Sequence, residues 1–374
     1  MNQGVNLNKK RILIAPLDWG LGHATRCIPI IRELLAAGYE VLLGATGKSA
    51  ILLQAEFPHL TLLPLPGYGI TYSKKKWSFI SKVIAQIPKI QKAIKAENKW
   101  LQQTVLDHRI DAVISDNRYG LYHSLIPCFL VTHQLALKTG FGAFADRIVQ
   151  KKLYKYVNKF KECWVPDAAE GITLAGDLSH PKILPNSKVS YIHYVSRFRA
   201  SSPDGLTYYI LILLSGPEPQ RSVLEAILLR QANELKEPVF FVRGLPGDSV
   251  LPAVPNHITI VNHLPTQAMQ SAMDGASYVV CRSGYSSVMD VVRMQKKAIM
   301  IPTPGQTEQE YLALHLMQNN IALCLPQSKF QLKNALSLAA TFPYKMEPVF
   351  NNDLLKKAVA SIGTYLQGAD TNNN

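Results

Sequence analysis

The stretch at 279–290 constrains the fold of this chain more than any other. It begins with an apolar run at 279–281, breaks at Ser283 and Gly284, and continues with apolar residues at helical spacing from Val288 onward. This order predicts a buried strand, a tight turn and a helix. The first N–H groups of a helix have no partner within it, so such a turn is a ready site for phosphate.

A second polar loop follows one strand later. The apolar run at 298–302 leads into the polar residues 303–310. Parallel strands end at the same edge of a sheet, and the loops that follow them therefore face the same ligand. We expect one ligand site to be formed by the loops after both strands.

Strand and helix patterns alternate through both halves of the 374-residue chain. This alternation predicts two doubly wound α/β domains that face each other across a cleft. The segment 196–205 is polar and contains Ser, Pro and Gly, the composition of a linker. We therefore place the first domain at 1–200, the second at 201–352 and a final helical segment at 353–374.

The chain is basic, with a formal net charge of +14 from 40 Lys and Arg against 26 Asp and Glu. Such a charge favours an anionic partner, and nucleic acid, anionic lipid and a phosphorylated substrate all fit it. The charge alone does not choose among them.

The cysteines indicate a reduced compartment, and the apolar runs bear on contact with a membrane. Five cysteines are scattered without a CxxC pair or metal-ligand spacing, which predicts free thiols and no zinc site. The N-terminus lacks the apolar core of a signal peptide, and no run reaches the roughly 20 apolar residues that span a bilayer. We expect a cytoplasmic protein whose membrane contact, if any, is peripheral.

The first predicted strand, 11–16, leads into a loop that contains Gly20, Gly22 and His23. A dinucleotide-binding fingerprint would require a third glycine where Thr25 stands, so an NAD site is a weak interpretation. An imidazole on such a loop is a good general base near neutral pH. The alternative is structural, with the glycines making the turn and the histidine capping the helix.

The sequence CRSGYSSVMDVVRMQKKAIMIPTPGQTEQEYLA, at 281–313, resembles the nucleotide-sugar domain of the GT-B glycosyltransferases, and specifically glycosyltransferase family 28. The resemblance covers most of 10–365 and is sharpest at 279–312. It implies two Rossmann-like domains with a last helix that returns to the first domain. It also implies inverting, metal-independent transfer from a UDP-sugar, with UDP-N-acetylglucosamine or a relative as donor. The UDP-sugar is a substrate, and no cofactor is expected.

The resemblance assigns the donor site to the second domain. Asp290 would bind the ribose, although the family usually has the longer Glu, and Glu310 stands where a second Gln would follow Gln309 at the sugar. The loop at 215–221 has one glycine and two prolines where the family has a glycine-rich diphosphate loop. The other donor-site residues that the resemblance implies are Gly216, Arg221, His263, Leu264, Arg282, Ser283 and Gly284.

The resemblance assigns the acceptor to the first domain. His23 would remove the proton from the acceptor hydroxyl, and an Asp at a later strand end would orient it. Asp116 ends the predicted strand 110–116 and is the first candidate for this partner, with Asp18 the second. The acceptor-side loops would contain Gly20, Gly22, His133 and Gln134.

The segment 72–102 combines eight lysines and one acid with aromatic and aliphatic residues. A cationic segment with an apolar face binds anionic membranes, and members of the family act on a lipid-linked acceptor at the cytoplasmic face. The segment predicts peripheral contact with the inner face of the membrane. The alternative is a solvated helix packed on the sheet.

Three other functions remain open at this point. A UDP-sugar 2-epimerase shares the fold, and a non-catalytic protein would bind a nucleotide sugar without turning it over. Nucleic-acid binding is suggested only by the charge, since the sequence contains no recognisable motif for it. We expect a sugar nucleotide and a lipid-linked or glycan acceptor as partners, and no nucleic acid.

Overall fold

The computed structural model describes residues 9–68, 87–199, 205, 207–247, 249–346 and 353–371. Of the basic segment predicted at 72–102, residues 72–86 lie outside the described residues, as does the predicted domain boundary at residue 200.

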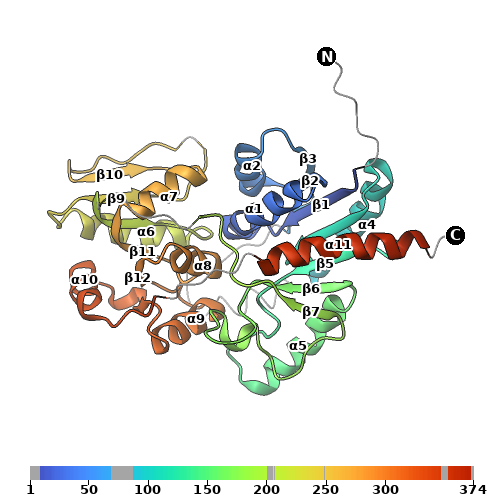
Figure 1. Ribbon diagram of the computed structural model, residues 1–374. Helices are drawn as coiled ribbons and strands as arrows, with labels where there is room; N and C mark the ends of the chain where they lie inside the picture. The colour runs from blue at the N-terminus through green and yellow to red at the C-terminus, as the bar shows by residue number, and fades with distance from the viewer. Residues whose placement is uncertain are drawn as a thin grey trace, which may run out of the picture.

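The first domain is built on a seven-stranded parallel sheet with the strand order β3-β2-β1-β4-β5-β6-β7 (Figure 1). Its elements are β1 (Arg11–Pro16), α1 (Leu21–Ala36), β2 (Glu40–Ala45), α2 (Gly47–Glu56), β3 (Thr61–Pro64), α4 (Ile87–His108), β4 (Ala112–Asp116), β5 (Cys128–Val131), α5 (Ala143–Val157), β6 (Glu162–Val165), a short 3-10 helix at Gly176–Leu178, and β7 (Lys188–Tyr191).

The second domain has a six-stranded parallel sheet with the order β10-β9-β8-β11-β12-β13. Its elements are β8 (Tyr208–Leu213), α6 (Gln220–Ala232), β9 (Val239–Val242), β10 (Ile258–Val261), α7 (Thr266–Asp274), β11 (Ala276–Cys281), α8 (Tyr285–Arg293), β12 (Lys297–Met300), α9 (Thr307–Gln318), β13 (Leu323–Cys324), a 3-10 turn at Gln327–Lys329, and α10 (Leu332–Thr341). Two parallel α/β domains confirm the predicted fold class.

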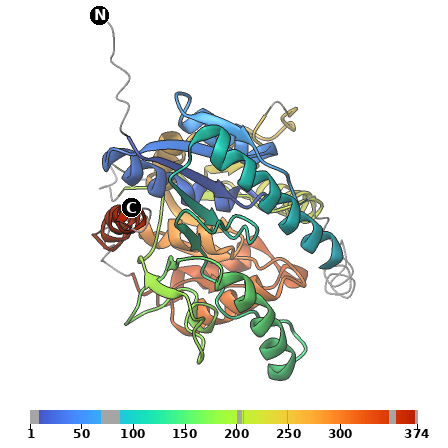
Figure 2. The same cartoon turned by 90° about the vertical axis from the view of Figure 1, so that its right-hand side faces the viewer.

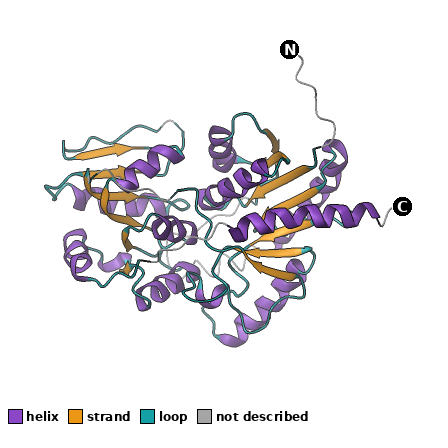
Figure 3. Cartoon of the chain, viewed as in Figure 1, coloured by secondary structure: helices purple, strands orange, loops and turns teal. Residues whose placement is uncertain are grey.

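The central strands are buried on both faces, as their continuous apolar runs predict. Ile12, Leu13 and Ile14 of β1 are completely buried, and so are Val279 and Val280 of β11. Figure 3 shows helices on both sides of each sheet, and these helices cover the two apolar faces.

The last helix, α11 (Asp353–Thr371), packs on the first domain rather than on the second, to which it is joined in sequence (Figures 1 and 2). It contacts α1, and the ring of Tyr365 lies edge-on to Phe129 at 5.5 Å between centroids. The Tyr365 hydroxyl also donates a hydrogen bond to Glu162 at 2.8 Å. The helix therefore ties the end of the chain to the first domain.

The strand order reverses direction once in each sheet, and both reversals face the space between the domains. In the first sheet β1 lies beside β4, so that Pro16 pairs with Asp116 at the strand ends. In the second sheet β8 lies beside β11, and Leu213 pairs with Cys281. Ligands of doubly wound sheets bind at such switch points, outside the carboxyl ends of the strands.

Candidate active site

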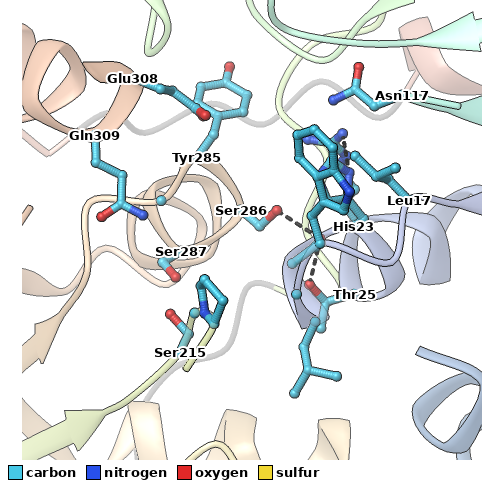
Figure 4. Close-up of a pocket in the computed structure, with 18 of the residues that line it drawn as sticks. Leu17, His23, Thr25, Asn117, Ser215, Tyr285, Ser286, Ser287, Glu308 and Gln309 are labelled. Carbon is cyan, nitrogen blue, oxygen red and sulfur yellow. Dashed lines mark hydrogen bonds between the residues drawn. The ribbon is translucent and has the colours of Figure 1, made fainter. Parts of the chain in front are cut away.

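A cavity of about 460 Å³ lies at these two switch points. It is lined by the loops that follow β1, β4 and β5 in the first domain and β8, β11 and β12 in the second. Figure 4 shows His23 and Asn117 on one side of it, and Ser215, Ser287 and Gln309 on the other. The loops after β11 and β12, where the sequence predicts a ligand site, therefore share this cavity with loops of the first domain.

Three helices begin at the cavity wall. The first residues of α1 (Leu21, Gly22, His23), of α8 (Tyr285, Ser286, Ser287) and of α9 (Thr307, Glu308, Gln309) all line it. In these described helices no side chain caps the first turn. Uncapped N–H groups and the positive ends of the helix dipoles make this wall attractive to an anion. The uncapped start of α8 follows directly after Ser283 and Gly284, and the phosphate site there stays a prediction.

Asp290 of α8 lies in the cavity wall, and only 7% of its surface is exposed. The hydroxyl of Ser196 donates a hydrogen bond of 2.6 Å to one carboxylate oxygen, and Arg197 Nε lies 3.8 Å from the other. Burial raises the pKa of Asp290 to about 6, against the opposing effects of Arg197 and Ser196. The segment that joins the domains therefore contacts the residue predicted to bind the ribose.

Other predicted donor residues that line the cavity are Gly216, His263, Gly284 and Gln309. The side-chain oxygen of Gln309 accepts a hydrogen bond from the backbone N–H of Thr303 at 2.9 Å. A Cβ on Gly284 would lie 3.7 Å from the side-chain nitrogen of Gln309, so this nitrogen faces the start of α8. The amide donor of Gln309 is thus presented beside the uncapped helix N-terminus.

Five predicted donor residues do not line the cavity: Arg221, Leu264, Arg282, Ser283 and Glu310. Arg221 pairs with Glu218 at 2.6 Å and with Glu225. The guanidinium of Arg282 donates to backbone carbonyls, including that of Gln220 at 2.9 Å, and burial lowers its pKa to about 10. Both arginines therefore have contacts within the protein.

The remaining members of this group also have structural contacts. The hydroxyl of Ser283 donates to the carbonyl of Gln309 at 2.9 Å, which ties the turn after β11 to α9. Glu310 accepts a hydrogen bond of 3.0 Å from the N–H of Gly305. Leu264 packs against the hydrophobic core. These contacts fix the loops that surround the cavity.

On the opposite wall, His23 and Asp116 lie together although 93 residues separate them in sequence. Nδ1 of His23 is 3.2 and 3.3 Å from the two carboxylate oxygens of Asp116, which is completely buried behind it. Burial lowers the pKa of His23, Arg26 lowers it further, and Asp116 only partly opposes them, so the pKa lies below 6.5. The imidazole is therefore neutral at pH 7, as a general base requires.

Arg26 is part of this cluster, although the sequence analysis did not single it out. Its Nε donates to Asp116 at 2.7 Å, and its Nη2 contacts the second carboxylate oxygen and lies 2.8 Å from His23 Nδ1. Burial opposes ionisation of Asp116, but Arg26 and His23 outweigh it and lower the pKa to about 2. Arg26 follows His23 by three residues on α1, a spacing that places both on one helix face.

The cluster extends across the cleft through His133. Nδ1 of His133 lies 3.3 Å from Arg26 Nη1, and its Nε2 lies 2.8 Å from a carboxylate oxygen of Glu308 on α9. The ring of His133 also stacks on Tyr285 at 4.1 Å between centroids. Glu308 was not predicted, although it directly precedes Gln309. The predicted residues Gly20, Gly22 and Gln134 line the same cavity.

The part of the cavity in the first domain has a largely apolar and aromatic wall. Its members include Leu17, Trp19, Tyr68, Ile90, Leu137 and Leu153. Within the described residues, the indole nitrogen of Trp19 and the side-chain oxygen of Asn117 are buried without a hydrogen-bond partner. This wall therefore suits a ligand with an apolar body and few polar groups.

Comparisons with known proteins agree with this geometry. Residues 254–358 match the glycosyltransferase family 28 C-terminal domain. A protein of Methanosarcina acetivorans named "Uncharacterized glycosyltransferase" is 23% identical over 326 residues, which cover 80% of this chain and 81% of the relative.

Solved glycosyltransferases share the fold. The glycotransferase of kitacinnamycin is 14% identical with a TM-score of 0.62, over 97% of this chain and 96% of that one. The glycosyltransferase VinC, in complex with DTDP, is 15% identical with a TM-score of 0.53, over 96% and 95% of the two chains. The predicted GT-B resemblance is confirmed. The chain therefore has the GT-B fold and contains a region that matches the glycosyltransferase family 28 C-terminal domain.

Proposed function

We propose that the protein is an inverting, metal-independent glycosyltransferase that moves an N-acetylhexosamine from a UDP-sugar to a lipid-linked acceptor. The observation that carries this proposal is one cavity with two chemically different walls. Uncapped helix N-termini form part of the wall in the second domain, and the partly buried His23 with the buried Asp116 stands on the wall in the first. The helix N-termini suit a diphosphate, and the His23–Asp116 pair suits the removal of a proton from an acceptor hydroxyl.

The diphosphate is proposed to bind at the start of α8, near Ser287 and the loop at Ser215 and Gly216. Gly216 has a φ of 101°, which favours glycine, and its backbone lines the cavity. Asp290 is proposed to take the ribose hydroxyls in place of Ser196, and the side-chain nitrogen of Gln309 to contact the sugar. These donors stabilise the charge that develops on the departing UDP without a metal ion.

Transfer then proceeds in one displacement. Neutral His23 removes the proton from the acceptor hydroxyl through Nε2, while Asp116 accepts a hydrogen bond from Nδ1–H. The acceptor oxygen forms a bond to the anomeric carbon as the bond from that carbon to the phosphate oxygen breaks. Attack from the first domain, opposite a diphosphate held by the second, inverts the anomeric configuration.

The acceptor is proposed to be lipid-linked and to be reached at an anionic membrane surface. The apolar wall of the first domain supports an acceptor with an apolar part. Phe144 and Ile148 on α5 are 78% and 44% exposed, and Arg147, Lys151 and Lys152 on this helix are also exposed. Apolar and cationic side chains on one surface helix suit an anionic bilayer. No helix in the described parts of the chain is long and apolar enough to cross it.

A thermal-shift titration with UDP, UDP-N-acetylglucosamine, UDP-glucose, dTDP and NAD tests the donor assignment. A ligand at 100 times its dissociation constant adds about 2.7 kcal/mol to the stability of the folded state. We expect the uridine nucleotides to raise Tm and Asp290→Ala to weaken this response. A response to dTDP alone would change the donor class, and no response to any nucleotide would contradict the proposal.

The reaction class is tested by incubating the protein with membrane lipid extract and the UDP-sugar that raises its Tm. Transfer predicts free UDP together with a glycosylated lipid. Conversion of the UDP-sugar to its epimer without release of UDP would instead indicate a 2-epimerase.

A further inference from the structure

Two buried polar atoms in the first domain's part of the cavity have no hydrogen-bond partner within the described residues. They are the indole nitrogen of Trp19 and the side-chain oxygen of Asn117. Trp19 lies in the loop after β1, and Asn117 directly follows β4. The two strands are neighbours in the sheet, and Pro16 pairs with Asp116 where they end. The sheet therefore brings one hydrogen-bond donor and one acceptor to the same edge, where both residues line the cavity.

This polar pair, Trp19 and Asn117, lies beside the proposed base. Asp116 directly precedes Asn117, and its carboxylate oxygen is 3.2 Å from Nδ1 of His23. Trp19 lies just before α1, the helix that carries His23. Figure 4 shows Asn117 and His23 on the same side of the cavity. A group bound by the polar pair would therefore belong to the acceptor, because the donor is assigned to the opposite wall.

The backbone does not require an amide at position 117. Asn117 has a φ of 56°, in the left-handed region that glycine adopts with least strain and that asparagine tolerates. Glycine would satisfy this turn without burying an unpaired oxygen, which costs free energy. The amide oxygen at this position is therefore better explained by a ligand than by the turn.

An unpaired indole nitrogen alone does not indicate a ligand. The indole nitrogen of Trp164 also has no partner among the described residues, but Trp164 is completely buried in the core and does not line the cavity. Trp19 differs because it lines the cavity together with an unpaired acceptor, Asn117. The argument for a ligand rests on this combination of donor and acceptor.

The two unpaired atoms complement a hydroxyl group. An indole N–H only donates, an amide oxygen only accepts, and a hydroxyl does both. The surroundings are apolar and aromatic: the ring of Trp19 lies edge-on to that of Tyr68 at 5.9 Å between centroids, and Leu17 and Ile90 pack in the same cluster. Such a wall suits the carbon skeleton that carries the hydroxyl.

We propose that Trp19 and Asn117 bind a second hydroxyl of the acceptor while the attacking hydroxyl lies at His23. Trp19 Nε1–H donates to the oxygen of this second hydroxyl, and its proton is donated to the Asn117 oxygen. The acceptor therefore ends in a polyhydroxylated group, a sugar or a glycerol, rather than in a single alcohol. This inference rests on the proposed function, which assigns the acceptor to the first domain.

The experiment uses the full-length protein labelled with ¹⁵N at its tryptophan indoles, without nucleotide. The signals of Trp19 and Trp164 are assigned by their loss in Trp19→Phe and Trp164→Phe. The probes are octyl β-D-glucoside, monooctanoylglycerol and 1-octanol, which have chains of the same length and are used below their critical micelle concentrations. We expect the glucoside or the glycerol ester to move the Trp19 N–H signal downfield and to leave that of Trp164 in place.

Asn117→Gly tests the acceptor half of the polar pair. Glycine suits the left-handed backbone and keeps the hydrogen bond from the N–H of residue 117 to the carbonyl of Val131. The variant should weaken calorimetric binding of the polyol probe by about two- to tenfold, the value of one hydrogen bond. Binding of 1-octanol should not change, because its only hydroxyl binds at His23. Asn320→Gly is the matched control, since Asn320 has a φ of 59° and does not line the cavity.

The two polyol probes separate the sources of the hydroxyl. A response to the glucoside alone would identify a sugar acceptor, and a response to the glycerol ester alone a glycerol acceptor. A Trp19 signal that neither probe moves would overturn the inference. Equal losses of affinity for polyol and 1-octanol in Asn117→Gly, or equal losses in Asn320→Gly, would also overturn it. No nucleotide is present, so the outcome is distinct from the thermal-shift test of the proposed function.

Discussion

The two walls of the cavity offer different chemical groups to a ligand. The wall in the second domain includes the uncapped starts of α8 and α9, and two nearby arginines are paired or bonded to carbonyls within the protein. The wall in the first domain carries a buried cluster of charged side chains around His23. Backbone donors tolerate changes of side chain, whereas a buried charge cluster depends on every member. The two walls should therefore respond differently to mutation.

The largest expected effect is on catalysis and comes from the wall in the first domain. His23→Ala should lower the rate of sugar transfer by about 10²–10⁴-fold, the usual contribution of a general base. The affinity for UDP should remain within about twofold, because the proposed nucleotide contacts lie on the other wall. Turnover at acceptor saturation and calorimetric UDP titration measure the two quantities. Loss of both turnover and UDP affinity in His23→Ala would show that the two walls do not act independently.

Asp290, on the wall in the second domain, should make the stability of the protein depend on pH. Its pKa is about 6 in the folded protein and 3.8 ordinarily, so the folded state binds more protons than the unfolded state between these values. Stability therefore falls as pH rises through this window, by up to about 3 kcal/mol. Asp290→Asn should remove this loss. The unfolding free energy of the variant, measured in urea, should therefore rise relative to that of the wild type from pH 4.5 to pH 7.5. A constant difference across this range would contradict the assigned pKa.

Arg221 distinguishes a structural arginine from a ligand-binding one. Arg221→Met removes its ion pairs with Glu218 and Glu225, although Arg243 still pairs with Glu225 at 2.8 Å. We expect a loss of about 1–3 kcal/mol in unfolding free energy, and little change in UDP affinity. Urea unfolding and calorimetry give the two values. A large loss of affinity with unchanged stability would restore Arg221 as a diphosphate contact.

The smallest expected effect concerns the contact between the walls. The hydroxyl of Ser286 on α8 donates to the carbonyl of Gly22 on α1 at 2.8 Å (Figure 4). Ser286→Ala should lower the unfolding free energy by about 0.5–1.5 kcal/mol, the net value of one hydrogen bond. Thermal unfolding measures it. A much larger loss would mean that domain docking depends on this one bond.

The fold and the strand-to-helix turns at the candidate site could be predicted from the sequence. The apolar runs that end at Ser283 and at the loop 18–26 indicate strands followed by helices, and helix starts are where backbone donors collect. His23 was singled out because an imidazole on such a loop can act as a general base and because the family resemblance assigns it that role. These features depend on local sequence. The helix after β11 begins at Tyr285, directly after the predicted turn, whereas α1 begins at Leu21, within the loop expected at 18–26.

The side-chain partners could not be predicted in the same way. Arg221 and Arg282 were assigned to the donor by their place in a motif, but burial requires that their charges be satisfied inside the protein. Glu308 meets His133 across 175 residues and two domains. Such pairs depend on how the domains dock, and no local pattern encodes that arrangement. Arg26 was within reach of sequence reasoning, since it lies one helical turn after His23.

The most direct test of the two-wall account is a calorimetric titration of UDP into the wild type and Ser287→Asp. Ser287 lies at the start of α8 in the cavity wall, where an added carboxylate would repel a phosphate while favouring the helix. Ser337→Asp, on an exposed position of α10, is the control with the same charge change. We predict that Ser287→Asp weakens UDP binding by about tenfold or more and that Ser337→Asp leaves it unchanged. Equal affinity in all three proteins would contradict the placement of the diphosphate at this helix.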